Sequence, residues 1–264
     1  MNYFSVSQEQ IKQFGRDGFL MVERLFDARE IGLLEKIARA DKEKASQVNT
    51  ARDARGGESR LWLSSETGRE DIYNGFCHGR RIIDTMEKLL DDEVYLYHYK
   101  MIDKEPRVGG AWEWHQDYGY WYNKKCLFPD MASCMIAVEH AHRGNGCFQV
   151  MRGSHKLGRI EHGTYGPPAG ADPARVALAA KHLDHVYCEM EPGTALFFHA
   201  NLLHRSDNNE SGDPRLVLIC CYNTRHNPCQ EEPGHPSYTP LIKWEDSQIL
   251  EPGERQWAEM QNSS

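Results

Sequence analysis

Residues 197–222 read FFHANLLHRSDNNESGDPRLVLICCY, two apolar runs with a polar segment between them. The polar segment is rich in Asn, Asp, Ser and Gly, which is typical of a turn, so the flanking runs predict neighbouring β-strands. Similar runs recur from residue 93 onward: EVYLYHYKMI, AWEWHQDYGYW, ASCMIAVEHA, GCFQVMRGSH and HVYCEMEPGTALFFHA. Short strands separated by turns predict a sandwich or barrel rather than parallel βαβ units.

The first 92 residues have a more helical character. Ser7 with Gln10 and Asp27 with Glu30 each predict a helix start, residues 19–26 predict a short strand, and the polar residues 46–60 predict a loop. An amphipathic helix is expected at 80–92, and an insertion with a short helix at 160–182. We therefore expect a mainly β (α+β) protein with one domain over residues 1–264. Its parts are a helical region at 1–92, a double-stranded β-helix (a cupin-like jelly roll) at 93–228, and a C-terminal extension at 229–264.

The composition of the chain limits the kinds of binding partner and the cellular location that are expected. The chain has 264 residues and a net charge of -8, without a basic tract, so no nucleic-acid partner is expected. No apolar stretch approaches the length of a membrane span, and the N-terminus does not resemble a secretory signal. The eight cysteines include no CxxC pair, and five of them lie in strand-like runs. This favours free buried thiols and a reducing, cytoplasmic location. Whether the chain forms a homo-oligomer is left open.

A metal site is suggested by residues 112–122, WEWHQDYGYWY, where His115 and Asp117 are two residues apart. In a strand, such residues point to the same face. Two His and one carboxylate form the ligand set of non-haem Fe(II) oxygenases. With 13 His in the chain the pair alone is weak evidence, and the third ligand must come from a distant strand. His204 is favoured over His199, because only His204 has Ser206 and Arg215 at suitable offsets.

Arg215 opens an apolar strand and therefore needs an anionic partner, since an unpaired buried charge is costly. Its planar fork suits a carboxylate, and the nearby Ser206 hydroxyl completes a site for a dicarboxylate such as 2-oxoglutarate. The H-x-D pair, the Asn145-Gly146-Cys147 and Gly153-Ser154-His155 turns, and H-x-S-x8-R together resemble the phytanoyl-CoA dioxygenase family of Fe(II)/2-oxoglutarate oxygenases. The resemblance covers about residues 8–228.

The resemblance implies that His115, Asp117 and His204 bind iron and that Arg215 and Ser206 bind 2-oxoglutarate. Lys100 and Met101 are assigned to the same co-substrate, with O₂ as the second co-substrate and ascorbate as a reductant. Asp117, in place of a small residue, favours hydroxylation over halogenation. Arg152 stands where the family usually has Pro, which puts a charge at that loop.

The substrate is less well determined. Aromatic residues around the metal motif can surround an ammonium group or simply fill a core: Tyr97, Tyr99, Tyr118, Tyr120 and Trp121. Four basic residues near the same segments can meet an anion such as a phosphonate: Arg60, Lys100, Lys104 and Arg107. A small zwitterion is therefore expected. The chain is similar, more weakly, to bacterial hydroxylases of 2-aminoethylphosphonate and its N-trimethyl analogue. A lid is expected at 46–60, around Gly56-Gly57 and Arg60.

Three alternatives remain open. The substrate can be another small molecule, such as a betaine, an amino acid or an acyl derivative. A zinc-dependent hydrolase or isomerase can use the same three ligands, but it does not need Arg215 and Ser206. A non-enzymatic jelly-roll binding protein would have lost its metal, which the intact ligand set opposes.

Overall fold

Two antiparallel sheets form the centre of the fold in the computed structural model, which describes residues 4–41, 48–65, 68–163, 170–229 and 238–262. The large sheet has seven strands, in the order β1 (Phe19–Val22), β11 (Ala195–His199), β6 (Met131–Ala137), β13 (Arg215–Thr224), β4 (Val94–Lys104), β3 (Glu58–Ser64), β2 (Asn49–Arg52). The small sheet has the order β10 (His185–Cys188), β7 (Phe148–Met151), β12 (His204–Ser206), β5 (Trp112–His115). A two-stranded ribbon pairs β8 (His162–Gly163) with β9 (Gly170–Ala171).

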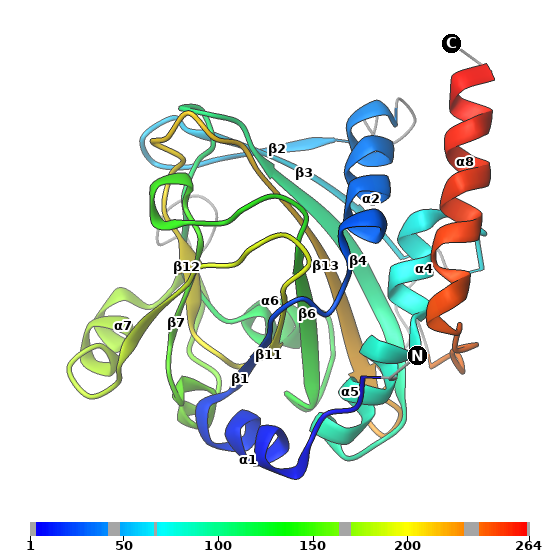
Figure 1. Ribbon diagram of the computed structural model, residues 1–264. Coiled ribbons are helices and arrows are strands. Elements are labelled where there is room, and N and C mark those ends of the chain that lie inside the picture. The colour runs from blue at the N-terminus through cyan, green and yellow to red at the C-terminus, as the bar shows by residue number, and fades with distance from the viewer. Residues whose placement is uncertain (1–3, 42–47, 66–67, 164–169, 230–237, 263–264) are drawn as a thin grey trace.

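Helices cover the outer face of the large sheet. In Figure 1, α2, α4 and α8 stand together on one side of this sheet, and β7 and β12 lie on the other. The helices are α1 (Gln8–Asp17), α2 (Ala28–Ala40), α4 (Ile72–His78), α5 (Arg80–Leu90), α6 (Asp117–Asn123), α7 (Pro173–Ala179) and α8 (Leu250–Asn262). Short 3₁₀ turns occupy η1 (Arg143–Asn145), η2 (Ser154–Leu157) and η3 (Asp246–Gln248). No helix in the described ranges has the length and apolar character needed to cross a bilayer.

Two cores result from this layering. Leu34, Phe76 and Ile83 of the helices pack with Phe197 on one face of the large sheet. Phe148 of the small sheet packs with the neighbouring Phe198, on the opposite face of β11. Burial on both faces explains why the central strands have nearly continuous apolar sequences. Two facing antiparallel sheets of this kind confirm the predicted double-stranded β-helix.

In the N-terminal region the two predicted helix starts are confirmed, the predicted strand at 19–26 is shortened to 19–22, α4 was not predicted, and residues 46–60 differ from the prediction. Ser7 and Asp27 cap α1 and α2 through the expected capping boxes. The predicted loop is wrong, because residues 49–52 and 58–64 form the β2–β3 hairpin at the edge of the large sheet. Its polar composition was misleading, since an edge strand is stabilised by backbone pairing and leaves many side chains in solvent. Residues 46–47 of the expected lid lie outside the described residues.

β-bulges interrupt two of the strands that border the interior of the fold. In β4, His98 pairs with Cys221 and Leu96 pairs with Tyr222, so Tyr97 is an extra residue. In β5, His115 pairs with His204, but Trp112, three residues earlier, pairs with Ser206, two residues away in β12. A bulge changes the face to which a side chain points, so strict alternation does not hold at either place.

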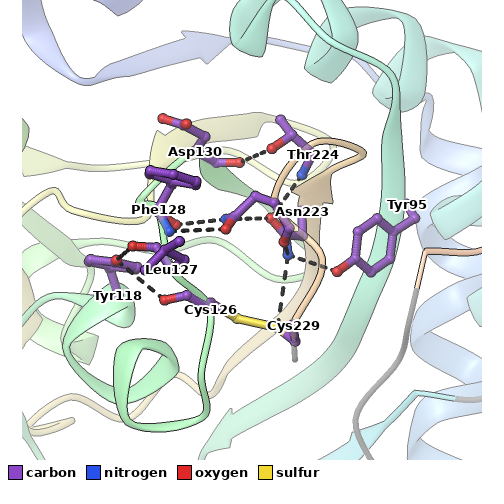
Figure 2. Close-up of a disulfide and its surroundings, with 10 residues drawn as sticks. Tyr95, Tyr118, Cys126, Leu127, Phe128, Asp130, Asn223, Thr224 and Cys229 are labelled. Atoms are coloured by element: carbon purple, nitrogen blue, oxygen red, sulfur yellow. Dashed lines mark hydrogen bonds between the residues drawn. A yellow bond between two sulfur atoms is a disulfide. The ribbon is translucent and has the colours of Figure 1, made fainter. Parts of the chain in front are cut away.

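A disulfide joins the loop after α6 to the loop after β13, between Cys126 and Cys229 (Figure 2). Around it, the Asn227 side chain accepts from the Phe128 backbone N–H and donates to the Phe128 carbonyl, at 2.9 and 2.7 Å. Thr224 Oγ1 also donates to the Asp130 carbonyl. The bond corrects the expectation that the chain has no disulfide, whereas the five cysteines of the strand-like runs are free and buried. The two residues are 103 positions apart, so only the folded chain brings them together.

Opening this disulfide should lower stability. It closes a loop of about 100 residues, and loss of such a cross-link costs about 2–4 kcal/mol of unfolding free energy. Chemical denaturation of the wild-type protein with and without dithiothreitol measures the difference, and Cys126→Ser is the matched variant that reductant should leave unchanged. Thiol titration of the denatured, unreduced protein should count the six cysteines that are free in the structure. A count of eight would contradict the cross-link.

Candidate active site

Three buried side chains converge between the sheets. His115 is the last residue of β5 and lies opposite His204 in β12, with ring centroids 4.1 Å apart. Asp117 is the first residue of α6, so the expected strand geometry of the H-x-D pair is wrong, because the chain turns into a helix at Gln116. The turn still brings the carboxylate to the two imidazoles. One ligand atom from each residue lies within 4.8 Å of the other two.

Hydrogen bonds fix which imidazole nitrogen of each histidine can bind a metal. His115 Nδ1 lies 2.6 Å from the Glu113 carbonyl, and His204 Nδ1 lies 2.9 Å from the Leu202 carbonyl. Each Nδ1 therefore carries the proton and donates, which leaves Nε2 with a free lone pair. Burial lowers the pKa of both histidines. Neutral imidazoles with free Nε2 atoms are the form that binds a metal.

The carboxylate of Asp117 stays ionised despite its burial. Burial alone would raise the pKa of Asp117, but the positive charge of the neighbouring Lys100 opposes it, and the pKa is lowered to about 2. Lys100 Nζ lies 3.7 Å from Asp117 Oδ1. Two neutral imidazoles and one carboxylate suit Fe(II), because this set leaves positions open for a chelating co-substrate and O₂. The residues present therefore fit an iron ion.

A second cluster of buried cations lies beside this triad. Arg215, the first residue of β13, is 2% exposed, and Lys104, the last residue of β4, is fully buried. Lys104 Nζ donates to Ser206 Oγ at 2.8 Å and to the Asp207 carbonyl at 2.5 Å, while Arg215 donates to the Gly146 carbonyl. Within the described residues no carboxylate pairs with either cation.

Two buried donors at this cluster have no acceptor among the described residues. Burial lowers the pKa of Arg215 to about 10, and burial with the neighbouring Arg215 charge lowers the pKa of Lys104. Arg215 Nε and Trp112 Nε1 are buried without a hydrogen-bond partner in the described part of the chain. Since Ser206 Oγ accepts from Lys104, its own hydroxyl hydrogen remains available to donate. A carboxylate of a bound co-substrate would satisfy these donors.

Comparison with known proteins gives the family. Residues 14–217 match the model of the family described as phytanoyl-CoA dioxygenase (PhyH). The chain belongs to this family. It is a non-haem Fe(II)- and 2-oxoglutarate-dependent dioxygenase, as the donor set indicates.

Several relatives of this family member cover most of its length. It is 26% identical to the L-proline trans-4-hydroxylase of Streptomyces griseoviridis, over 91% of this chain and 93% of that protein. It is also 26% identical to the ectoine dioxygenase of Sphingopyxis alaskensis, over 84% of this chain and 77% of that protein. The crystal structure of EctD from S. alaskensis with 2-oxoglutarate and 5-hydroxyectoine shares the fold. Its TM-score is 0.77 at 23% identity, over 91% of this chain and 88% of that one.

A cavity of about 330 Å³ opens at the triad and at Arg215. Three of the residues predicted to contact the substrate line this cavity: Tyr97, Tyr120 and Trp121. Their contact with a substrate stays a prediction. Lys100 also lines the cavity, but its described ionic partner is Asp117.

Four other predictions need correction. Tyr99 and Met101 point to the core on the helix side of the large sheet. A regular strand would put them on the same face as Tyr97, but the bulge at Tyr97 puts that residue on the opposite face. Tyr118 faces away from the cavity and donates its hydroxyl to the Leu127 carbonyl at 2.6 Å. Arg60 lies at the surface, within 3.4 Å of Glu105.

The structure explains why His199 is not a metal ligand and which residues of the cavity were not predicted. His199 Nδ1 accepts from the Asn201 backbone N–H, and its ring lies near Phe14, away from the triad. His98 and Lys124 line the cavity but were not predicted. Lys124 would have been found if residues 117–123 had been interpreted as a helix, because it follows Trp121 by three residues.

A substitution at Gly146 provides a test of the proposed co-substrate end of the cavity. Gly146 has φ of +75°, and an added Cβ would overlap the Asp207 carbonyl oxygen, the atom that Lys104 also contacts. We expect Gly146→Ala to lower the unfolding free energy by about 1–3 kcal/mol and to weaken 2-oxoglutarate binding, because it displaces partners of Arg215 and Lys104. Denaturation and co-substrate titration measure both effects. Gly212→Ala is the control, since nothing lies within 4 Å of its added Cβ.

Proposed function

We propose that the protein hydroxylates an unactivated C–H group of a small, amino-acid-like zwitterion. The observation that carries this proposal is the lining of the cavity, where aromatic rings from β4 and α6 lie close to cationic side chains. Among the described lining residues, Asp117 is the only acid, and it is assigned to the metal. An ammonium group of the substrate would therefore bind to aromatic faces, and its anionic group to a lysine or arginine.

The size of the cavity supports a small substrate. Ligand pockets are commonly about 300–1,000 Å³. The cavity is near the lower limit, and it must also contain 2-oxoglutarate. The relatives named for L-proline and ectoine support the same class of substrate. An acyl-CoA is disfavoured, because only a fraction of such a molecule could enter.

Phosphonates remain members of the proposed class. 2-Aminoethylphosphonate and its N-trimethyl analogue combine an ammonium group with an anion, as amino acids do. The trimethyl form would gain most from Tyr97, Tyr120 and Trp121, since each cation–π contact contributes about 0.5–2 kcal/mol. The expected reaction on these compounds is hydroxylation of the carbon next to phosphorus.

When bound, Fe(II) supplies the O₂ chemistry in which 2-oxoglutarate becomes succinate and CO₂ and one oxygen atom becomes the product hydroxyl. The chain's own residues position the partners of that reaction. Arg215, Ser206 and Lys104 orient the co-substrate carboxylate, and Lys100 stays beside Asp117. The rings of Tyr97, Tyr120 and Trp121 hold the substrate and exclude water from the reacting C–H.

Succinate release under air tests the proposal, with Fe(II), ascorbate and 2-oxoglutarate present. The panel contains L-proline, ectoine, glycine betaine, 2-aminoethylphosphonate and its methylated forms, and one acyl-CoA. Stimulation of succinate release by a zwitterion supports the proposal. A preference of the enzyme for N-methylated substrates would indicate that the rings of Tyr97, Tyr120 and Trp121 contact the ammonium group. Stimulation by the acyl-CoA alone would overturn the substrate class. Metal-bound protein that forms no succinate would instead favour the zinc hydrolase reading.

A further inference from the structure

The cations that line the cavity are not equivalent. They are Lys100, Lys124, Arg205 and Arg215. Lys100 lies beside Asp117, and Arg205 Nη2 lies 3.2 Å from Asp207 Oδ1 while its Nε donates to Gln149. Arg215 is assigned to 2-oxoglutarate. Within the described residues the Lys124 side chain has no ion pair or hydrogen bond, so it is the cation available to a substrate.

Lys124 is placed next to the aromatic wall by the helix that carries both. It directly follows α6 and lies three residues after Trp121, and the Lys124 backbone N–H donates to the Trp121 carbonyl. Side chains three residues apart on a helix are neighbours, about 5–6 Å apart at Cβ. Trp121 is 5% exposed and packs edge-on against Tyr97, with ring centroids 5.3 Å apart, whereas Lys124 is exposed. The ring is therefore deep in the cavity and the ammonium is at its mouth.

We propose that Lys124 binds the anionic group of the substrate at the cavity mouth, while Trp121 and Tyr97 contact its cationic part. This inference rests on the proposed function and adds an orientation to it. The anion points outward, toward solvent, and the remainder of the substrate extends toward the iron ligands. Because the two recognition groups are one helical turn apart, the substrate has its opposite charges separated by only a few bonds. Lys124 thereby selects carboxylate or phosphonate zwitterions over simple amines.

The experiment compares Lys124→Met with Lys125→Met, since Lys125 is the adjacent lysine and does not line the cavity. The probes are L-proline, 2-aminoethylphosphonate and its N-trimethyl form, titrated anaerobically into protein loaded with Fe(II) and 2-oxoglutarate. We expect Lys124→Met to raise the Kd of a binding probe about tenfold, with Lys124→Arg closer to wild type. In turnover, KM for the probe rises while kcat and KM for 2-oxoglutarate stay within about twofold. Added salt should weaken probe binding in the wild type more than in Lys124→Met.

Three outcomes would overturn the inference. Equal effects of Lys124→Met and Lys125→Met on the Kd would indicate that the lysines act only through the overall positive charge of this surface, without a direct contact to the substrate. A parallel loss of kcat and 2-oxoglutarate affinity would indicate damage to α6. If no zwitterion binds the wild type, the inference fails, but slow succinate formation without substrate would still support the oxygenase chemistry. The failure of the inference is thus distinguishable from the failure of the enzyme assignment.

Discussion

His204→Ala should lose iron and, with it, more than about 100-fold of the succinate-forming activity. Removing even an outer partner of a metal ligand costs about 10–100-fold in metal affinity, and His204 provides one of only three protein donors. The site then has two donors on β5 and α6 and none on β12. Iron content after desalting and succinate formation at saturating 2-oxoglutarate measure the loss.

His199→Ala is the matched control for this change. His199 is also a strand histidine, partly buried and five residues earlier in the chain, but it contacts Asn201 and Phe14 instead of the triad. It should keep its iron and most of its turnover. If His204→Ala retained iron while His199→Ala lost it, the assignment of the third ligand would be wrong.

Arg215→Met should raise the KM for 2-oxoglutarate on the order of 100-fold. Losing one partner of a buried charged hydrogen-bond pair costs about 2–5 kcal/mol, and each 1.4 kcal/mol is about a factor of ten. The same change should not reduce stability without co-substrate, because it removes a buried cation that has no acidic partner in the described structure. Initial rates over a range of 2-oxoglutarate concentrations and thermal unfolding measure the two effects.

Arg225→Met provides the comparison for Arg215→Met. Arg225 follows the other end of β13, at the surface, and pairs with Glu93 at 3.2 Å. It should leave the KM for 2-oxoglutarate unchanged. Equal KM values in wild type and Arg215→Met would exclude Arg215 from the co-substrate site.

The members of the metal cluster, with Ser206 and Arg215, could be brought together from the sequence because their information is local. Met101 was wrongly assigned beside them, and Lys104 was not assigned there. His204, Ser206 and Arg215 fall within twelve residues, and their offsets alone distinguish His204 from His199. Asp117 was assigned correctly to the cluster for a wrong geometric reason, since the chain turns into α6 after His115. Residue type and spacing thus identified the donors even where the secondary structure was mistaken.

The features that could not be predicted depend on strand pairing over long distances. The β2–β3 hairpin has a loop-like composition, and only its pairing with β4 makes it a strand. The faces of Tyr97 and Tyr99 depend on a bulge opposite Cys221, more than a hundred residues away. The Cys126–Cys229 bond has the same origin. Neither periodicity nor spacing in a single sequence contains such register information.

The bulge residue Tyr97 in β4 also affects how the aromatic lining of the cavity could differ between relatives. If Tyr97 were deleted, Leu96 and His98 would become neighbours opposite Tyr222 and Cys221, and the ladder would run without interruption. Leu96 and Tyr99 would still face the helices, and His98 would still face the cavity. A one-residue change in chain length would thus remove an aromatic ring from the wall without disturbing either core. Divergence in substrate within such a lineage would be recorded as gaps in an alignment, where a comparison of substitutions alone would overlook it.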